Sequence, residues 1–252
     1  MALANGVLVH GPNAWACAVR LPDGTLKQAS AQKRFRAARV EQPLLRGPAR
    51  VLEVFALLPE VRRRLPEARL PFERPAVAAA MAAGAAATQL VRRSALGPAA
   101  KEVLAGFASL APAAVALRGT TLAAYHGAEH ISIGSYEHGE RREKEHERCG
   151  SHLVGPLLAT MVAGNTLAAR APEHLRGPAR AAAAFGALAT ATEVFSWMAR
   201  HPDSRVAKLL AKPGHELQHR LATEEPTPEQ LEVAEAALAA CLRLEDPNGR
   251  SD

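Results

Sequence analysis

The sequence predicts a mainly α-helical protein, a helical bundle preceded by a small antiparallel β meander. Alanine, the strongest helix former, supplies much of the apolar 48% of the 252-residue chain. From residue 43 onward, apolar side chains recur at steps of three and four, which is the period of an α-helix. The first thirty residues differ, because short β-type runs alternate there with turn residues.

The β meander is expected over residues 1–30. The run VLVH (7–10) is followed by Gly11-Pro12-Asn13, and the run AWACAVRL (14–21) is followed by Pro22-Asp23-Gly24. In the second turn, proline presets the first φ angle and glycine accepts a positive one. The segment is long enough for a small sheet only.

The rest of the chain is predicted to form one domain with the meander, over residues 1–246, with a frayed tail at 247–252. Prolines interrupt the helical pattern near 65–75, and Gly-Pro pairs recur beyond it. The expected helical parts are 43–65, a bundle over 76–210 that carries the histidine cluster, and a C-terminal helix over 227–245.

The start of the C-terminal helix has a clear signature. Thr227 is placed to cap it, Pro228 falls at its first position, and Gln230 stands where a capping box requires a glutamine or glutamate. The following run LEVAEAALAACLRL has the pattern of an amphipathic helix.

Charge and hydropathy limit the partners. The net charge is +6, but the arginines are dispersed and no aromatic residues interleave with them, so we expect no nucleic-acid partner. Three cysteines without a secretion signal point to a reducing compartment. Four alanine-rich apolar stretches are shorter than a spanning helix of roughly 20 residues. The stretches are 76–91, 103–117, 153–169 and 181–198. They are typical of buried bundle helices or of marginal membrane segments. The protein is therefore expected in the cytoplasm or at a membrane, with a membrane surface or a membrane protein as a partner.

Chemistry-bearing residues gather in the middle of the chain, where five of the ten histidines lie between 126 and 152. His126 and His130 are four residues apart, so on a helix both rings share one face and can meet one ion. With Glu129 they form H-x-x-E-H, a pattern of zinc hydrolases in which the glutamate acts as general base on metal-bound water. The sequence therefore predicts a divalent metal, most naturally zinc, on these histidines.

The third ligand stays open among three candidates. Glu193 lies in an apolar helix, where a carboxylate needs a partner. Glu137 lies on the face of His126 and His130 but about 10 Å along the helix from His130, so it reaches the ion only if the helix breaks at Gly134. Cys149, with His146 near it, completes a His/Cys site.

A second metal-binding pattern, H-E-x-x-H, occurs at residues 215–219. It follows Pro213 and Gly214 and is soon followed by Pro226, so we expect a short helix there. Zinc peptidases of this type need a longer helix and a downstream ligand. We interpret this match as a coincidence.

Several motifs together resemble the YqhQ-like bacterial proteins, a family of unknown function usually described as predicted metal-dependent enzymes. The resemblance implies a Tyr-His-Gly-Ala-Glu-His core at 125–130, an Arg-Cys-Gly at 148–150 and a family glutamate at Glu193. It also implies membrane-spanning segments, although the corresponding stretches here are rich in alanine. It does not imply a particular substrate. The segments that carry it are 6–24, 43–53, 124–140, 146–153, 191–195 and 212–238.

The resulting hypothesis is a metal-dependent, peptidase-like hydrolase with Glu129 as the catalytic base and an unknown small molecule or peptide as substrate. One alternative is a membrane-associated scaffold or assembly factor, in which the same His, Glu and Cys residues hold a structural metal or a polar network. Another is a helical binding module without metal.

Overall fold

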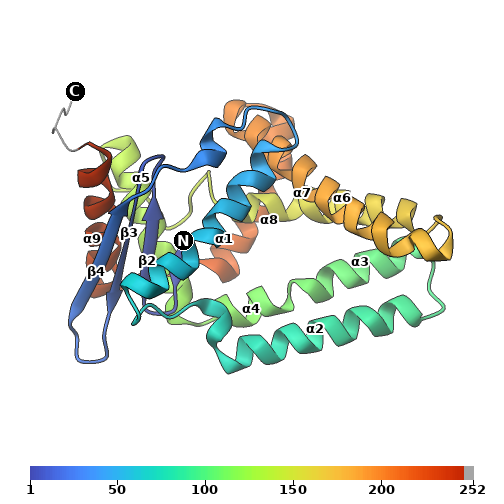
Figure 1. Cartoon of the computed structure of the whole chain (residues 1–252), viewed down its shortest axis with the longest axis horizontal. Helices are drawn as coiled ribbons and strands as arrows, with labels where there is room; N and C mark the ends of the chain where they lie inside the picture. The colour runs from blue at the N-terminus through green and yellow to red at the C-terminus, as the bar shows by residue number, and fades with distance from the viewer. Residues whose placement is uncertain (247–252) are drawn as a thin grey trace.

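The computed structural model describes residues 1–246 and confirms the predicted fold class, because helices dominate and a small antiparallel sheet occupies the N-terminus (Figure 1). The tail predicted at 247–252 lies outside the described residues. Short 3₁₀ helices connect the longer elements at Arg36–Arg39, Pro71–Glu73, Gly150–Leu153 and Glu173–Leu175.

The sheet is a meander of four strands in the order β1-β2-β3-β4, all antiparallel. In its register Val7 of β2 lies opposite Ala18 of β3, and Ala18 lies opposite Gln28 of β4. The inner strand β3 is buried on both faces, which explains its nearly continuous apolar sequence. The strands are β1 (Ala2–Leu3), β2 (Gly6–His10), β3 (Ala14–Arg20) and β4 (Leu26–Gln32).

Helices cover both faces of this sheet. On one face Trp15 packs in a core with Leu57 and Val61 of α1 (Arg46–Arg64). On the other, Val7 and Ala18 pack against α5 (Thr121–His138) and α9 (Pro228–Glu245). The predicted cap of α9 is present, since Thr227 accepts from Gln230 N and the capping box is closed. The sheet thus has a hydrophobic core on each face, one shared with α1 and the other with α5 and α9.

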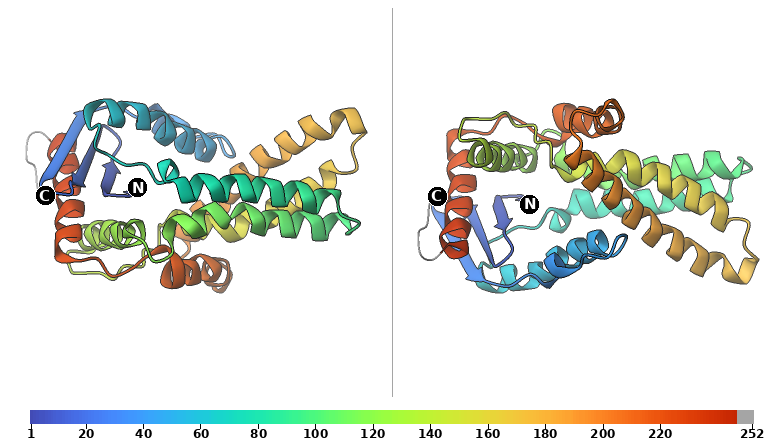
Figure 2. Two further views of the ribbon diagram at one scale, coloured as in Figure 1. Left: turned by 90° about the horizontal axis from the view of Figure 1, so that it is seen from below. Right: turned by 90° about the horizontal axis from the view of Figure 1, so that it is seen from above.

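The remaining helices form an elongated arm that projects from the sheet (Figure 2). It consists of two neighbouring helical pairs, in which α2 packs on α3 and α6 packs on α7. The bounds are α2 (Pro75–Arg93), α3 (Pro98–Ser109), α4 (Ala111–Leu117), α6 (Val154–Ala168) and α7 (Arg176–Arg200).

The apolar stretches left two alternatives open, buried bundle helices or marginal membrane segments, and the helices of the arm are less buried than the first alternative expects. Large apolar side chains such as Phe107, Leu167 and Phe185 are at least half exposed on it. Within the described residues, one segment is long and apolar enough to cross a membrane, Pro98–Leu117, and only 17% of its window is buried. Short alanine side chains bury little area, so these helices pack without enclosing their larger apolar residues.

Helix α8 (Arg205–Leu217) is longer than expected, because it runs through Pro213. It continues into a π-helical turn, Gln218–Ala222. Gly214 has a packing reason: a Cβ atom there would lie 2.6 Å from the Cα of His152. This contact joins the end of α8 to the loop that follows α5.

Candidate metal centre

Helix α5 presents the two histidines predicted to act together. Thr120 stands at its N-cap position, but its hydroxyl donates to Ala116 O instead of capping the helix. The helix runs unbroken through Gly134 and ends at Gly139, which adopts a left-handed φ of 71°. Tyr125 packs toward the sheet, while His126 and His130 lie under the segments 141–152 and 218–224.

Gly127 allows one of these segments to approach closely. A Cβ atom at this position would lie 2.2 Å from the carbonyl oxygen of Glu224. Glu224 N in turn donates to Ala123 O at 3.1 Å, which fastens the segment to α5. The glycine inside the histidine motif therefore serves the placement of the neighbouring chain.

His126, His130 and Cys149 converge. Their ligand atoms all lie within 4.8 Å of one another. The His126 and His130 ring centroids are 4.3 Å apart, and His126 Nε2 lies 3.5 Å from Cys149 Sγ. Two donors of one tetrahedral zinc ion stand about 3.5 Å apart, so small side-chain rotations bring the three atoms to that geometry.

Backbone carbonyls fix the tautomer of both rings. His126 Nδ1 donates to Ala222 O at 2.8 Å, and His130 Nδ1 donates to Lys144 O at 2.6 Å. In a neutral ring the proton then sits on Nδ1, and the Nε2 lone pair is free to bind a cation. Metal-binding histidines ordinarily have a partner of this kind on the second nitrogen.

Cys149 has the character of a thiolate. Burial alone opposes ionisation, but hydrogen bonds from His126 and His130 lower the pKa of its thiol to about 4. Conversely, although burial opposes it, the hydrogen bond with Cys149 helps raise the pKa of His126 above its ordinary value. Cys149 also caps the 3₁₀ helix Gly150–Leu153, where its sulfur accepts from Ser151 N at 3.5 Å. A thiolate has the chemistry to bind a metal ion or to act as a nucleophile.

Glu129, the predicted general base, follows His126 and precedes His130 on α5 and is largely but not fully buried. Burial opposes its ionisation, but the Met1 amino group and the imidazoles of His126 and His130 hold the pKa of the carboxyl below its ordinary value. One oxygen pairs with the Met1 amino group. The other, Oε2, is buried and has no hydrogen-bond partner among the described residues.

The other two ligand candidates lie elsewhere. Glu193 forms an ion pair with Arg46 of α1 and accepts from Leu44 N, so its need for a partner is met there. Because α5 does not break at Gly134, Glu137 stays on the helix and pairs with His146 and Arg148. Of the three candidate third ligands, the structure brings Cys149 to the histidine pair.

The second motif, at 215–219, does not form a site of its own. The His215 and His219 ring centroids are 6.5 Å apart. His219 Nδ1 lies 3.0 Å from a Glu145 oxygen, and Glu216 pairs with Arg220 at 2.8 Å.

Two further residues lie near the centre: His146, which the sequence offered together with Cys149, and Gln218, which it did not single out. His146 lies with its ring centroid 5.5 Å from that of His130, and its Nδ1 accepts from Arg148 N. Burial and the nearby His130 lower the pKa of this imidazole. Gln218, inside the second motif, is fully buried and bonds to the loop around Cys149. A buried glutamine has no sequence signature, so only the fold reveals it.

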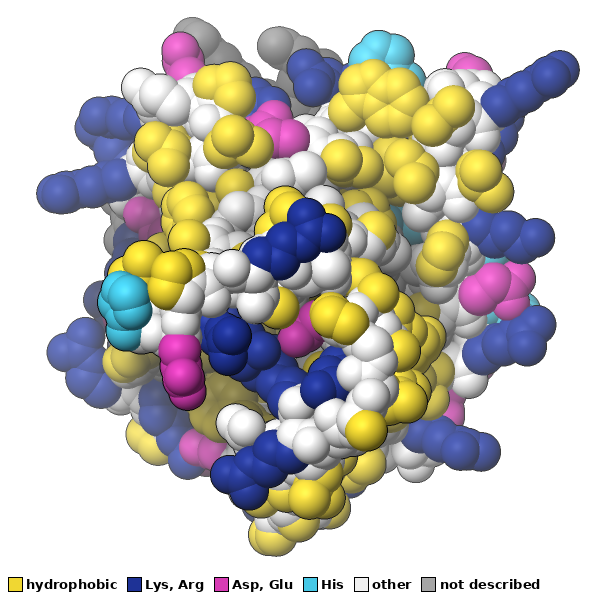
Figure 3. Space-filling model, turned by 90° about the vertical axis from the view of Figure 1, so that its right-hand side faces the viewer, with side chains coloured by type: hydrophobic (Ala, Val, Ile, Leu, Met, Phe, Trp, Pro, Cys, Tyr) yellow, Lys and Arg dark blue, Asp and Glu magenta, His cyan; other side chains and the backbone are white. Residues whose placement is uncertain are grey.

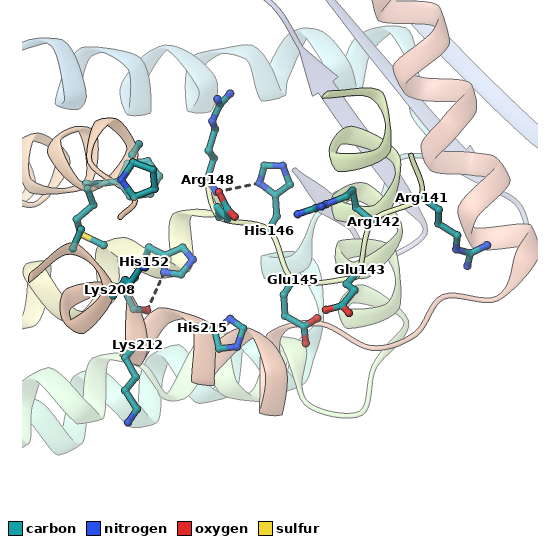
Figure 4. A pocket seen from close by; sticks show the side chains of 17 residues that line it. Arg141, Arg142, Glu143, Glu145, His146, Arg148, His152, Lys208, Lys212 and His215 are labelled. Atoms are coloured by element: carbon teal, nitrogen blue, oxygen red, sulfur yellow. Dashed lines mark hydrogen bonds between the residues drawn. The ribbon is translucent and has the colours of Figure 1, made fainter. Parts of the chain in front are cut away.

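A cavity of about 910 Å³ adjoins the centre (Figure 4). Its walls combine charged residues of the segment 141–148 with apolar residues of α7 and α8, among them Phe195 and Met198. His146 lies on the wall, whereas the three converging donors do not. The imidazole of His146 therefore both lines the cavity and lies close to His130.

Comparisons with known proteins place the centre within a matched segment. An uncharacterized protein, YqhQ, of Bacillus subtilis (strain 168) is 36% identical over 132 residues, which cover 48% of this chain and 40% of the relative. The match thus spans less than half the length of that relative. No solved structure matches the chain. Residues 120–244, which include α5, Cys149 and the π-helical turn, match the family described as "Protein of unknown function (DUF1385)".

Proposed function

We propose that His126, His130 and Cys149 bind one divalent cation and that the protein is a metal-dependent hydrolase. The observation that carries the proposal is the convergence, within 4.8 Å, of a thiolate and two imidazoles whose Nδ1 atoms are already engaged. Two nitrogens and one sulfur suit zinc. Three protein ligands leave a fourth position for water, as catalytic zinc sites do.

A zinc ion held by His126, His130 and Cys149 would supply Lewis acidity, which would lower the pKa of a water to about 7 and polarise a substrate carbonyl. Glu129 has the role of general base, because its buried Oε2 lacks a hydrogen-bond partner among the described residues and can accept a proton from the attacking water. His126 and His130 hold their rings toward the ion through their carbonyl partners. A small molecule or peptide with a hydrolysable carbonyl is the matching substrate class.

Substrate access is assigned to the cavity beside His146. The cavity is large enough for a small ligand or a short peptide, and its apolar and charged walls suit a molecule with both characters. Access to the cation from this side passes by the His146 ring, because that ring lines the cavity and lies close to His130.

The first test is metal content. Protein purified without chelator should contain close to one equivalent of a divalent transition metal, measured by elemental analysis. Cys149→Ala and His126→Ala should each lose it, because each removes one of three ligands. Wild-type protein without bound metal that also fails to take up added Zn²⁺ would refute the proposal.

The alternative is a non-enzymatic centre in which the cation, or the polar network alone, is structural. It is favoured by the position of the donors off the cavity walls and by the burial of His130, which is 5% exposed. Glu129→Gln separates the two functions. In a hydrolase it abolishes turnover of a peptide or ester library and leaves metal content unchanged, whereas a structural centre has no turnover to lose.

We also propose that the arm rests on an anionic membrane surface. Apolar side chains on it, such as Phe107 and Phe185, are 62% and 50% exposed. The far end of the arm, which faces the viewer in Figure 3, mixes apolar with basic side chains. Such a mixture suits the boundary between acyl chains and anionic headgroups. Basic residues in the turns and helix ends there are Arg92, Arg93, Lys101, Arg170, Arg176 and Arg180.

Flotation with vesicles tests the membrane proposal. Wild-type protein should float with vesicles of phosphatidylcholine and phosphatidylglycerol and much less with phosphatidylcholine alone. Phe107→Ser/Phe185→Ser should reduce flotation, whereas Phe55→Ser on α1, which removes an aromatic side chain of 59% exposure outside the arm, should not. Equal flotation of the arm variant and wild type would contradict the proposal.

A further inference from the structure

Gln218 is a fully buried polar residue, with 0% of its surface exposed. It opens the π-helical turn Gln218–Ala222 that extends α8. π-helical turns are rare and occur frequently at functional sites. Burying an amide lowers the stability of the fold unless its oxygen and nitrogen are both hydrogen-bonded. The hydrogen-bond partners of Gln218 therefore show which segments its side chain holds in place.

The side-chain amide of Gln218 forms hydrogen bonds to the loop on both sides of Cys149. Its Oε1 accepts from His146 N at 2.8 Å, and its Nε2 donates to Ser151 Oγ at 2.8 Å. Nε2 also lies 3.2 Å from His146 O and 3.0 Å from His152 Nε2. The bonds to residues 146 and 151 bracket Cys149, so this side chain fixes the path of the backbone that carries the thiolate.

The other end of the same turn orients the two histidines. Ala222 O, the last carbonyl of the turn, accepts from His126 Nδ1. The next residue, Thr223, accepts from Lys144 Nζ at 3.3 Å through its carbonyl, and Lys144 O is the partner of His130 Nδ1.

The turn is itself closed by Thr223, which donates from its backbone N and from Oγ1 to Gln218 O at 3.1 and 3.0 Å. All three donors of the centre are therefore tied to one five-residue turn and the residue after it. Local distortion of this turn is expected to move the donors relative to one another.

We propose that Gln218 is a positioning residue of the metal centre and that the π-helical turn is the element that sets the mutual geometry of His126, His130 and Cys149. This inference rests on the proposed metal binding. In this proposal the motif at 215–219 does not bind the cation, as it would in a zinc peptidase. Its glutamine, Gln218, instead holds the ligands that His126, His130 and Cys149 supply.

The test compares Gln218→Met, which keeps the length of the side chain and removes both hydrogen-bonding groups, with wild type. Metal-free protein is titrated with Co²⁺, and the thiolate-to-cobalt charge-transfer band is followed. We expect Gln218→Met to bind Co²⁺ about 10–100-fold more weakly, the usual effect of losing a partner of metal ligands, with a weakened band. Asn165→Leu, which removes a buried amide from α6 in the arm, is the matched control and should leave affinity and band unchanged.

A second readout needs no metal. In chelator-treated protein the rate of alkylation of Cys149 by iodoacetamide reports its contact with the imidazoles. Gln218→Met should raise this rate at least ~10-fold, because the loop that carries Cys149 loses its bonds at residues 146 and 151 and the sulfur becomes more accessible to the reagent. If wild type binds no Co²⁺, the proposed function fails, and the alkylation rates still decide whether Gln218 positions Cys149.

Circular dichroism first establishes that Gln218→Met folds. If it does not, Ser151→Ala and Lys144→Met replace it, because each removes one tie between the turn and the donors. A folded Gln218→Met with wild-type Co²⁺ affinity, spectrum and alkylation rate would overturn the inference. So would replacement variants that both match wild type in these measurements.

Discussion

Cys149 should react with iodoacetamide at a rate that hardly depends on pH. A pKa of about 4 keeps its thiol fully ionised above pH 6. An ordinary thiol, with a pKa of about 8.5, is about 0.3% ionised at pH 6 and about 75% ionised at pH 9, a rise of roughly 250-fold. The pH dependence of the rate in metal-free protein therefore distinguishes the two kinds of thiol.

The expected rates follow from two opposing effects. At pH 6 Cys149 has about 300 times more thiolate than an ordinary cysteine, but its lower basicity makes each thiolate roughly 100-fold less nucleophilic. It should thus react about threefold faster than an ordinary thiol at pH 6 and about 100-fold slower at pH 9. Its own rate should change by less than about twofold between these pH values.

The assay is mass spectrometry of the alkylated protein over time. Burial raises the pKa of Cys17 to about 12 and also raises the pKa of Cys241, so neither should compete at pH 6. Cys149→Ser should remove the labelling. His126→Ala should restore a dependence on pH, because a major stabilising hydrogen bond is lost. A wild-type rate that climbs about tenfold per unit from pH 6 to pH 8 would refute the thiolate–imidazole arrangement.

Four further substitutions test particular contacts by urea unfolding or elemental analysis. Gly127→Ala should lower the free energy of unfolding by about 1–3 kcal/mol, because its Cβ would lie 2.2 Å from Glu224 O. Gly186→Ala, in the open on α7, should raise it by about 0.5–1 kcal/mol, and equal effects would contradict the packing argument. Glu193→Gln should leave metal content unchanged; loss of the metal would show that Glu193 is a ligand after all. Thr227→Ala should destabilise the protein by about 0.5–2 kcal/mol, and no change would mean that its cap contributes nothing.

Elements with local signals were predictable from the sequence. The cap and proline at 227–230 define the start of α9, and the turns at 11–13 and 22–24 define the meander. The placement of the arm was not predictable. Its alanine-rich helices carry small side chains on several faces, so no single apolar stripe selects a partner helix.

The pairing of His126 with His130 was also predictable from the local sequence, because two residues four apart on a helix share a face. The third member of the cluster was not. The sequence showed that Glu193 needed a partner, and the fold supplies Arg46, 147 residues away, through contacts between α1 and α7. Cys149 reaches the histidines because Gln218 fixes its loop, and that contact joins segments about 70 residues apart.

A centre assembled from such distant segments exists only in the folded chain, so cation binding must stabilise the fold. The donors come from α5 and a loop 23 residues beyond His126, and the turn that orients them lies near residue 220. Zn²⁺ at 100 times its dissociation constant should then raise the free energy of unfolding by about 2.7 kcal/mol. Urea unfolding with and without Zn²⁺ measures this shift, and Cys149→Ser should lose most of it, because the ion then has two ligands instead of three. Equal shifts in wild type and Cys149→Ser would mean that any bound zinc sits elsewhere on the protein, and the centre on α5 would lose its central argument.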